Sequence, residues 1–437
     1  MRHLSWSLLG LFLVPPLLVA QERPVAFRDA RILPVSGPAI EHGTLVVQGG
    51  KIIAVGASGA VSIPDGADIH DARGRVIMPG LVDTHSHIGD GAGGDRSAPI
   101  QGDVRILDAI DVQSDNIHRA RAGGITTVNI MPGSGHLMSG QTAYLKLRNG
   151  HTINDLLYCK DPLTDICGGL KMANGTNPRG SPPWPGTRAK EAALIREKFL
   201  KAVEYRHKLE LAKTDSTKRP ERDLEMETLV QVLEGKRIVH HHTHRYDDIL
   251  TVLRLQKEFG FRVVLHHVSE GWKVAKEIAA AGVPCSVILI DSPGGKLEAM
   301  NLRMETAAVL DSAGVLVAFH TDDYITDSRF LIRSAALGVR AGLSRQRALE
   351  ALTIAGAKML DLQDRVGTLE PGKDADFLVL SGDPFSTYTH VEETWAGGER
   401  VFDRSNPEDR RYATGAFRLM RDNDAEDDDD GDRGGAQ

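Results

Sequence analysis

The middle of the chain repeats one pattern, in which a helical segment ends at glycine and a short apolar, β-branched run follows. The pattern recurs in residues 112–133, 247–267, 270–290 and 297–323. Glycine is the expected stop of a helix, and repeated strand and helix units imply parallel strands joined by right-handed crossovers. About eight such units close into a (β/α)8 barrel of roughly 250 residues. An open doubly wound sheet is the alternative, but no GxGxxG follows the first strand to favour it.

The two ends of the chain share a different pattern, short β-rich segments separated by turns. It is found in residues 25–56 and again in residues 366–403. We therefore predict that residues 21–80 and 361–405 together build one small sheet domain. Residues 81–360 should form the barrel, with a charged helical insertion at about 188–236.

The first twenty residues have the order of a secretory signal. A basic start is followed by an apolar run over residues 8–19 and by Ala20. The run is shorter than the about 20 apolar residues that span a bilayer. We expect cleavage after residue 20 and export of the protein to the periplasm or the medium. No stable membrane span should remain after cleavage. An uncleaved membrane anchor is the alternative. Residues 406–437 form an extension whose acidic end we expect to be disordered.

Charge and cysteine content exclude some kinds of site. A formal net charge of -7 argues against nucleic-acid binding, which needs a concentrated positive surface. The cysteines are Cys159, Cys167 and Cys285, and Cys159 and Cys167 are the nearest pair for a disulfide in an exported chain. No CxxC pair exists, so any metal should be held by histidine and carboxylate.

Histidines end the first predicted barrel strand, in the segment MPGLVDTHSHIG. His85 and His87 are two residues apart, so both side chains project to the same side of the strand. The C-terminal ends of barrel strands carry the chemistry of barrel enzymes. Lys171 lies on the short predicted strand of CGGLKMANG. By composition alone we interpret it as a lysine at a strand end near solvent, because most lysines are exposed.

Three later strands end in similar side chains. In RIVHHHTH, alternation points His240, His242 and His244 to one side, and only His242 or His244 reaches the active end. His266 and His267 are adjacent, so alternation predicts that just one of them joins the site.

The final strand of the predicted barrel ends in HTDD, with His320, Asp322 and Asp323. An inward aspartate at this position is a natural general base and can also bind metal. Imidazoles with one carboxylate suit zinc, and also manganese, cobalt or iron.

Six motifs together resemble those of the metal-dependent amidohydrolase superfamily, above all its imidazolonepropionase-like and Xaa-Pro dipeptidase-like members. They are MPGLVDTHSHIG, GLKMANGTNP, HTHRYDDIL, LHHVSEG, HTDD and VGTLEPGKDADFLVL. They span nearly the whole mature chain. The resemblance implies a distorted (β/α)8 TIM barrel with a small β-sandwich from both termini, in agreement with the pattern above.

The resemblance also implies a role for individual residues at the strand ends. His85 and His87 correspond to metal ligands on the first strand. Lys171 corresponds to the fourth-strand lysine that is carboxylated in binuclear members and bridges two metal ions. Asp322 corresponds to the final-strand aspartate, which binds metal and takes a proton from the attacking water.

On the fifth and sixth strands the resemblance chooses between neighbours. His242 corresponds to the fifth-strand ligand and His267 to the sixth-strand ligand. His244, His266 and His320 are expected around the ligands, in contact with them or with substrate. His266 stands where relatives often carry an acidic residue.

The implied function is that of a hydrolase that cleaves an amide-type C–N bond by a metal-activated water. The substrate would be a small molecule or short peptide: a dipeptide, an N-acyl amino acid or a cyclic amide. The cofactor would be one or two divalent ions, zinc favoured, and two ions bridged by carboxylated Lys171 are favoured over one. A homo-oligomer is left open.

Two alternatives remain. One is a mononuclear deaminase or imidazolone-ring hydrolase, whose members usually carry an acid three residues after the fifth-strand histidine, where this chain has Arg245. The other is a non-catalytic metal-binding protein, against which the presence of every ligand position argues.

Overall fold

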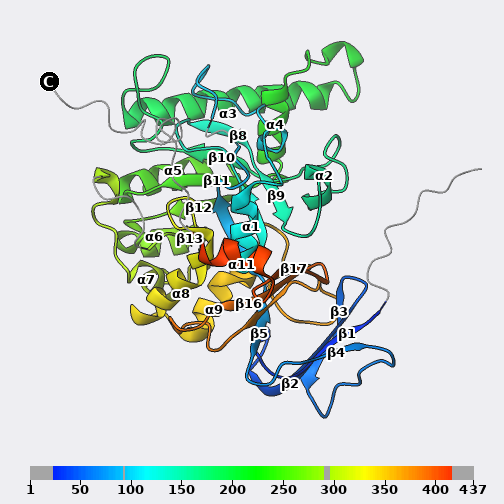
Figure 1. The fold of residues 1–437 in the computed structure, drawn as a ribbon. Helices are drawn as coiled ribbons and strands as arrows, with labels where there is room; N and C mark the ends of the chain where they lie inside the picture. The colour runs from blue at the N-terminus through cyan, green and yellow to red at the C-terminus, as the bar shows by residue number, and fades with distance from the viewer. Residues whose placement is uncertain (1–22, 92–93, 290–295, 416–437) are drawn as a thin grey trace, which may run out of the picture.

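The structure, a computed structural model, describes residues 23–91, 94–289 and 296–415 (Figure 1). A barrel of strands with helices on its outside forms the larger body, and a β domain lies at one end of it. The predicted signal, residues 1–20, and the acidic end of the extension, from residue 416 on, lie outside the described residues. Within the described residues, no helix is long and apolar enough to cross a membrane.

Both ends of the chain contribute strands to one eight-stranded sheet. These are β1 (Val25–Ile32), β2 (Ile40–Gln48), β3 (Lys51–Ala57), β4 (Asp68–Asp71), β5 (Val76–Pro79), β15 (Phe377–Leu380), β16 (Val391–Ala396) and β17 (Glu399–Asp403). The order is β17-β16-β15-β5-β1-β2-β3, with β4 beside β1. The two ends of the chain meet where β5 pairs antiparallel with β15. The prediction of one β domain from both termini is confirmed.

The barrel wall consists of two further sheets. One contains β6 (Leu81–Ser86), β7 (Ile125–Ile130) and β9 (Ala143–Lys146), and the other β8 (Met138–Gln141), β10 (Leu170–Ala173), β11 (Val239–Thr243), β12 (Val263–His267), β13 (Cys285–Val287) and β14 (Val317–Phe319). The strands from β10 to β14 pair in parallel. The strands β8 and β9 run antiparallel to their partners, which makes this a distorted barrel. The ends of the parallel strands meet at one face.

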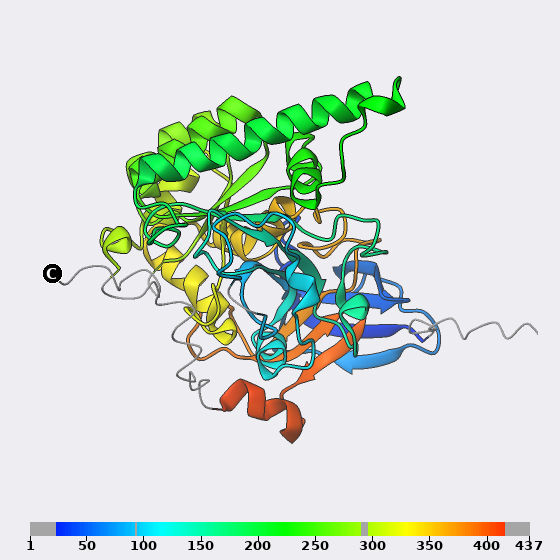
Figure 2. The ribbon, with the colours of Figure 1, turned by 90° about the horizontal axis from the view of Figure 1, so that it is seen from above.

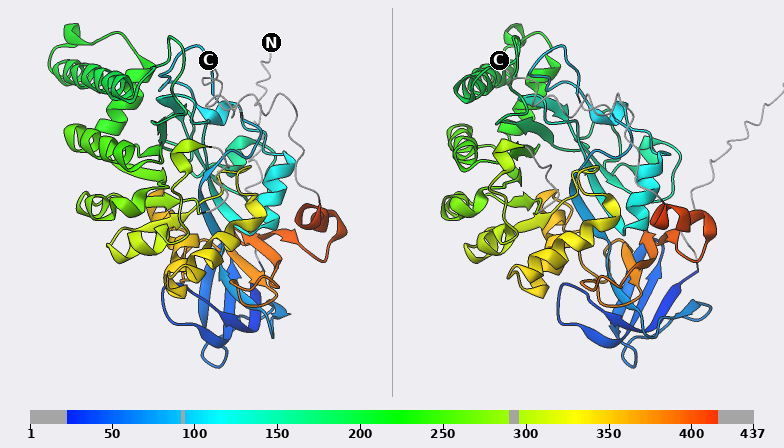
Figure 3. Two further views of the ribbon diagram at one scale, coloured as in Figure 1. Left: turned by 90° about the vertical axis from the view of Figure 1, so that its left-hand side faces the viewer. Right: turned by 60° about the vertical axis from the view of Figure 1, so that its left-hand side comes forward.

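Helices form an outer layer around these strands, as Figures 2 and 3 show. They are α1 (Asp115–Ala122), α2 (Ile153–Leu156), α3 (Arg188–Leu211), α4 (Leu224–Leu233), α5 (Tyr246–Phe259), α6 (Ala275–Ala280), α7 (Thr306–Ser312), α8 (Leu331–Arg340), α9 (Arg345–Leu352) and α10 (Ile354–Met359). The predicted extension begins with α11 (Pro407–Thr414), which lies against α1.

The charged segment between β10 and β11 forms α3 and α4, joined by a short 3-10 turn at Ser216–Lys218. Its acidic and basic side chains pair at the surface, as Lys201 does with Glu197. The inner side of α3 is apolar, and the buried Phe199 ring stacks on Phe259 and Phe261 with centroids 5.1 and 5.2 Å away. The segment is therefore part of the helical layer as well as a charged surface.

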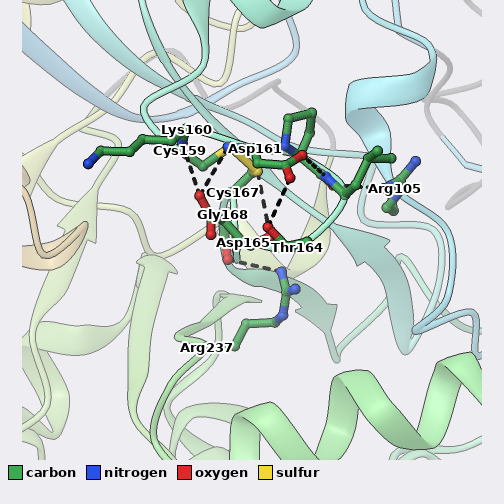
Figure 4. Close-up of a disulfide and its surroundings, with 11 residues drawn as sticks. Arg105, Cys159, Lys160, Asp161, Thr164, Asp165, Cys167, Gly168 and Arg237 are labelled. Atoms are coloured by element: carbon green, nitrogen blue, oxygen red, sulfur yellow. Dashed lines mark hydrogen bonds between the residues drawn. A yellow bond between two sulfur atoms is a disulfide. The ribbon is translucent and has the colours of Figure 1, made fainter.

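A disulfide joins Cys159 and Cys167, the pair nearest in sequence (Figure 4). It closes a loop in which the Asp165 carboxylate accepts hydrogen bonds from the backbone N–H groups of Lys160 and Asp161. Cys285 is buried in β13 as a free thiol.

One buried aspartate ties the first barrel strand to the last. The Asp83 carboxylate, on β6, accepts hydrogen bonds from the backbone N–H and the hydroxyl of Thr321, which follows β14. The Asp322 backbone N–H in turn donates to the His85 carbonyl over 2.9 Å. Burial raises the pKa of Asp83 to about 7, although the hydrogen bonds from Thr321 and His85 act in the opposite direction. These contacts bring the end of β14 to the end of β6.

Candidate metal centre

Four of the predicted site residues meet at the ends of β6, β10 and β14. The Nε2 atom of His85 lies 3.0 Å from Nζ of Lys171, 3.3 Å from Nε2 of His87 and 3.2 Å from Oδ1 of Asp322. His87 Nε2 lies 3.1 Å from the same Asp322 oxygen, and its Nδ1 is held by the Met131 carbonyl. We call His85, His87, Lys171 and Asp322 the β6 cluster.

Asp322 is held in the left-handed region of backbone conformation. Its φ angle is 50°, which few non-glycine residues adopt and which aspartate adopts more readily than most. Burial opposes the charge on the carboxylate, but the neighbouring His85, His267 and His87, two of which contribute hydrogen bonds through Nε2 of His85 and His87, outweigh burial and hold the pKa of Asp322 well below its usual range. Asp322 is therefore a carboxylate at neutral pH.

A second group of histidines lies at the ends of β11 and β12. The ring centroids of His242, His244 and His267 are 4.4 to 4.8 Å apart, and each ring is buried. We call these three residues the β11–β12 cluster. The two clusters adjoin, because His267 Nδ1 lies 3.8 Å from Oδ2 of Asp322.

Both histidines at the end of β12 enter the barrel interior, so the prediction that they face opposite sides is wrong. His266 is in register with His242 and packs its ring 4.9 Å from that of His85. The His267 ring lies equally close to His85, although alternation should turn it outward. The reason is the backbone, because His267 and Val268 have φ angles of 68° and 43°, and regular strand alternation ends there.

His266 belongs to a deeper layer of side chains below the two clusters. Its Nε2 lies 3.0 Å from Nδ1 of His240, whose other nitrogen lies 2.8 Å from the Tyr144 hydroxyl. His320 Nε2 lies 3.2 Å from Nδ1 of His267, and its Nδ1 lies 2.8 Å from the Ser286 hydroxyl. His240 thus lies below the strand end, as predicted, and His320 contacts a predicted ligand.

Burial keeps the histidines of the barrel interior uncharged. It lowers the pKa of His240 and His320 to about 3 and that of His242 to about 4. It also holds the pKa values of His85, His244 and His267 well below the usual range. A neutral imidazole is the form that binds metal.

The residues of both clusters fit a divalent metal. Three sets of side chains bring their ligand atoms within 4.8 Å of one another: His85, His266 and His320; His242, His244 and His267; and His85, His267 and Asp322. Among the described residues, both ring nitrogens of His242 and the Nε2 of His267 are buried without a hydrogen-bond partner. Buried polar atoms normally have a partner, and a nitrogen-rich set with one carboxylate suits zinc. The role of each residue as a ligand stays a prediction.

Two charged residues at this site were not identified from the sequence. Glu298 and Lys296 lie at and next to the 3-10 turn Leu297–Ala299, which follows β13. The buried Glu298 carboxylate lies 3.8 Å from Nε2 of His242 and accepts the Thr176 N–H at 2.7 Å. Lys296 Nζ lies 3.2 Å from Glu298 and 3.4 Å from His244 Nε2. Neither residue stands in a motif or at a strand end, so no sequence signal marks them.

The comparisons with known proteins agree with this geometry. A family model described as "Amidohydrolase family" matches residues 184–402. An amidohydrolase structure from Thermotoga maritima MSB8 is 37% identical, with a TM-score of 0.81 over 87% of this chain and 100% of that one.

Two curated relatives match over most of the chain. Amidohydrolase tasK of Hapsidospora irregularis is 27% identical over 83% of this chain, and the match spans only 40% of the length of that relative. Imidazolonepropionase of Alkaliphilus metalliredigens is 23% identical over 84% of this chain and 91% of that protein. The predicted superfamily and its imidazolonepropionase-like character are confirmed. The chain belongs to the amidohydrolase family, whose members are metal-dependent enzymes that hydrolyse carbon–nitrogen bonds.

Proposed function

We propose that this enzyme hydrolyses an amide-type C–N bond in a small substrate, which is a dipeptide, an N-acyl amino acid or a cyclic amide. The observation that carries the proposal is the convergence of the six predicted residues at one end of the barrel. Asp322 links both clusters, with His85 and His87 on one side and His267 on the other. A strand-end site that gathers histidines and one carboxylate fitted to hold metal is suited to hydrolysis.

We further propose that the site holds two zinc ions and that carboxylated Lys171 bridges them. Lys171 is buried, and its amine lies 3.0 Å from His85 Nε2. When bound, such ions polarise the substrate carbonyl and lower the pKa of water. The residues for one ion are those of the β6 cluster, and those for the other are on β11 and β12.

The chain itself contributes the proton transfers. Because Asp322 is ionised at neutral pH, its carboxylate can accept the proton of the attacking water and return it to the leaving nitrogen. The left-handed backbone at Asp322 and the N–H donated to the His85 carbonyl fix the position of this carboxylate.

The match to an imidazolonepropionase along nearly its whole length supports the alternative of an imidazolone-ring hydrolase, and within the proposed substrate class it favours a cyclic amide. A mononuclear site of the deaminase kind is less favoured. The residue three after His242 is Arg245, which makes an ion pair with Asp247 over 2.9 Å and brings no carboxylate to the metal. Lys171 is moreover inside the site.

We also propose that the protein is exported, with residues 1–20 as its signal. The Cys159–Cys167 disulfide supports this, because disulfides persist mainly in oxidising compartments. Expression of the full chain should yield a secreted or periplasmic protein that begins near Gln21, as N-terminal sequencing would test.

The experiment for the activity is a hydrolysis screen with zinc added. It would cover dipeptides, N-acyl amino acids, lactams and imidazolones, with amino-heterocycles included to detect deaminase activity. Release of an amine or a ring-opened acid from one class is the expected result. Ammonia released from amino-heterocycles alone would overturn the proposal in favour of a deaminase. The Asp322→Asn variant is the control, since its turnover should be abolished while its fold is kept.

A further inference from the structure

The β11–β12 cluster contains one histidine more than the predicted ligand set requires. His242 and His267 are the predicted ligands, and His244 completes a compact trio with them. The centroid of the His244 ring lies 4.7 Å from that of His242 and 4.8 Å from that of His267. Three imidazoles with one open position form a known kind of catalytic zinc site.

We infer that His244 is a metal ligand, and that His242, His244 and His267 are enough to retain one divalent ion when the bridging Lys171 is lost. The inference rests on the proposed function, and it adds His244 as the third ligand of this ion. Nitrogens that share a zinc ion at about 2.0–2.1 Å stand roughly 3.4 Å apart in tetrahedral geometry. The three ligand atoms lie within 4.8 Å of one another, so small rotations of the rings suffice.

Among the residues that the structure describes, the hydrogen bonds around the trio leave nitrogens of His242 and His267 without a partner, whereas His244 Nε2 faces Lys296 Nζ at 3.4 Å, which a metal ion would displace. His244 Nδ1 lies 2.7 Å from the Ser269 hydroxyl, and His267 Nδ1 lies 3.2 Å from Nε2 of His320. Partners of this kind fix the tautomer and orientation of metal-binding histidines. Within the described part of the chain, His267 Nε2 and both nitrogens of His242 have no hydrogen-bond partner.

The tautomer of His244 follows from its second neighbour. Lys296 Nζ lies 3.4 Å from His244 Nε2, and an ammonium group can only donate. Nε2 therefore carries the lone pair, and the proton is on Nδ1, where the Ser269 oxygen can accept it. This is the tautomer that a ligand binding through Nε2 requires.

The trio is positioned by its own strands and by neighbours on the chain. His242 and His244 are on and directly after β11, His267 ends β12, and the orienting groups are Ser269 and His320. Loss of the Lys171 amine should therefore remove the ion held by the β6 cluster and leave the other.

The test is a count of zinc ions per chain, by mass spectrometry of the elements after loading and dialysis of the mature protein. The wild type should hold two ions, Lys171→Met one, and Lys171→Met/His244→Phe none. His244→Phe keeps the ring volume and removes the nitrogens. Ser269→Ala keeps all three ligands and loses only the orienting bond, so it should bind zinc about 10–100-fold more weakly in a chelator competition.

His241→Phe is the matched control, because His241 is a buried neighbour on the same strand whose Nδ1 lies 2.9 Å from the carbonyl of His242. It should still hold two ions. The inference is overturned if Lys171→Met holds no zinc, or if His244→Phe and Ser269→Ala bind zinc as tightly as the wild type. Metal-dependent turnover of the wild type would then still support the proposed function. A wild type that binds no zinc would overturn both.

Discussion

Asp83 and Thr321 join the first and last barrel strands through two hydrogen bonds to one buried carboxylate. Thr321 directly precedes Asp322, so this contact also positions the proposed base. Thr321→Val should lower the free energy of unfolding by about 1–3 kcal/mol, because it leaves a buried acceptor with one donor fewer. It should also lower kcat more than it changes KM. Urea denaturation and steady-state kinetics would measure both effects, and the exposed Thr214→Val is the control.

A second prediction concerns the packing of α3. Phe199 is fully buried against Phe259 and Phe261, whereas Leu200 next to it is 50% exposed. Phe199→Ala should cost about 3–5 kcal/mol of stability, because it leaves a cavity in the core. Leu200→Ala should cost less than about 0.5 kcal/mol. Equal effects in urea denaturation would show that α3 is not packed on the barrel.

A third prediction concerns pH. Burial raises the pKa of Glu191 to about 7 from an ordinary value of 4.5, against the hydrogen bond from Gly175. The folded state binds this proton more tightly, so the stabilisation is full below pH 4.5 and is lost as the pH rises through about 7. The free energy of unfolding, measured by urea denaturation, should therefore fall with pH more in the wild type than in Glu191→Gln. The difference should change by up to about 3 kcal/mol between pH 4.5 and about 7. If the difference in unfolding free energy between the two proteins did not change with pH, the raised pKa of Glu191 would be contradicted.

The disulfide gives a fourth prediction. Cys159 and Cys167 are separated by 8 positions, and closing so short a loop should stabilise the fold by about 2–3 kcal/mol. The double variant Cys159→Ser/Cys167→Ser should unfold at a correspondingly lower urea concentration. Reductant should lower the midpoint of urea unfolding of the wild type and leave that of the double variant unchanged. Equal sensitivity of both proteins to reductant would contradict a disulfide in solution.

The sequence predicts the barrel, the joined β domain and most of the site, because strand ends that carry histidine and aspartate are visible as motifs. His85, His87 and Asp322 are in this group. Alternation fails for His266 and His267 because the chain leaves the strand conformation at His267, and a left-handed φ at a histidine has no sequence signature. Glu298 reaches His242 only through the tertiary fold, from a turn after β13. Spacing along the chain cannot show such a contact.

The most direct test of the account is the metal dependence of turnover. Wild-type protein would be stripped with a chelator, its metal content measured, and its hydrolysis of the best substrate from the screen followed before and after zinc is added. We predict that activity disappears with the metal and returns with zinc. The Asp322→Asn protein should stay inactive under every condition. Full activity in protein shown to be free of metal would contradict the account.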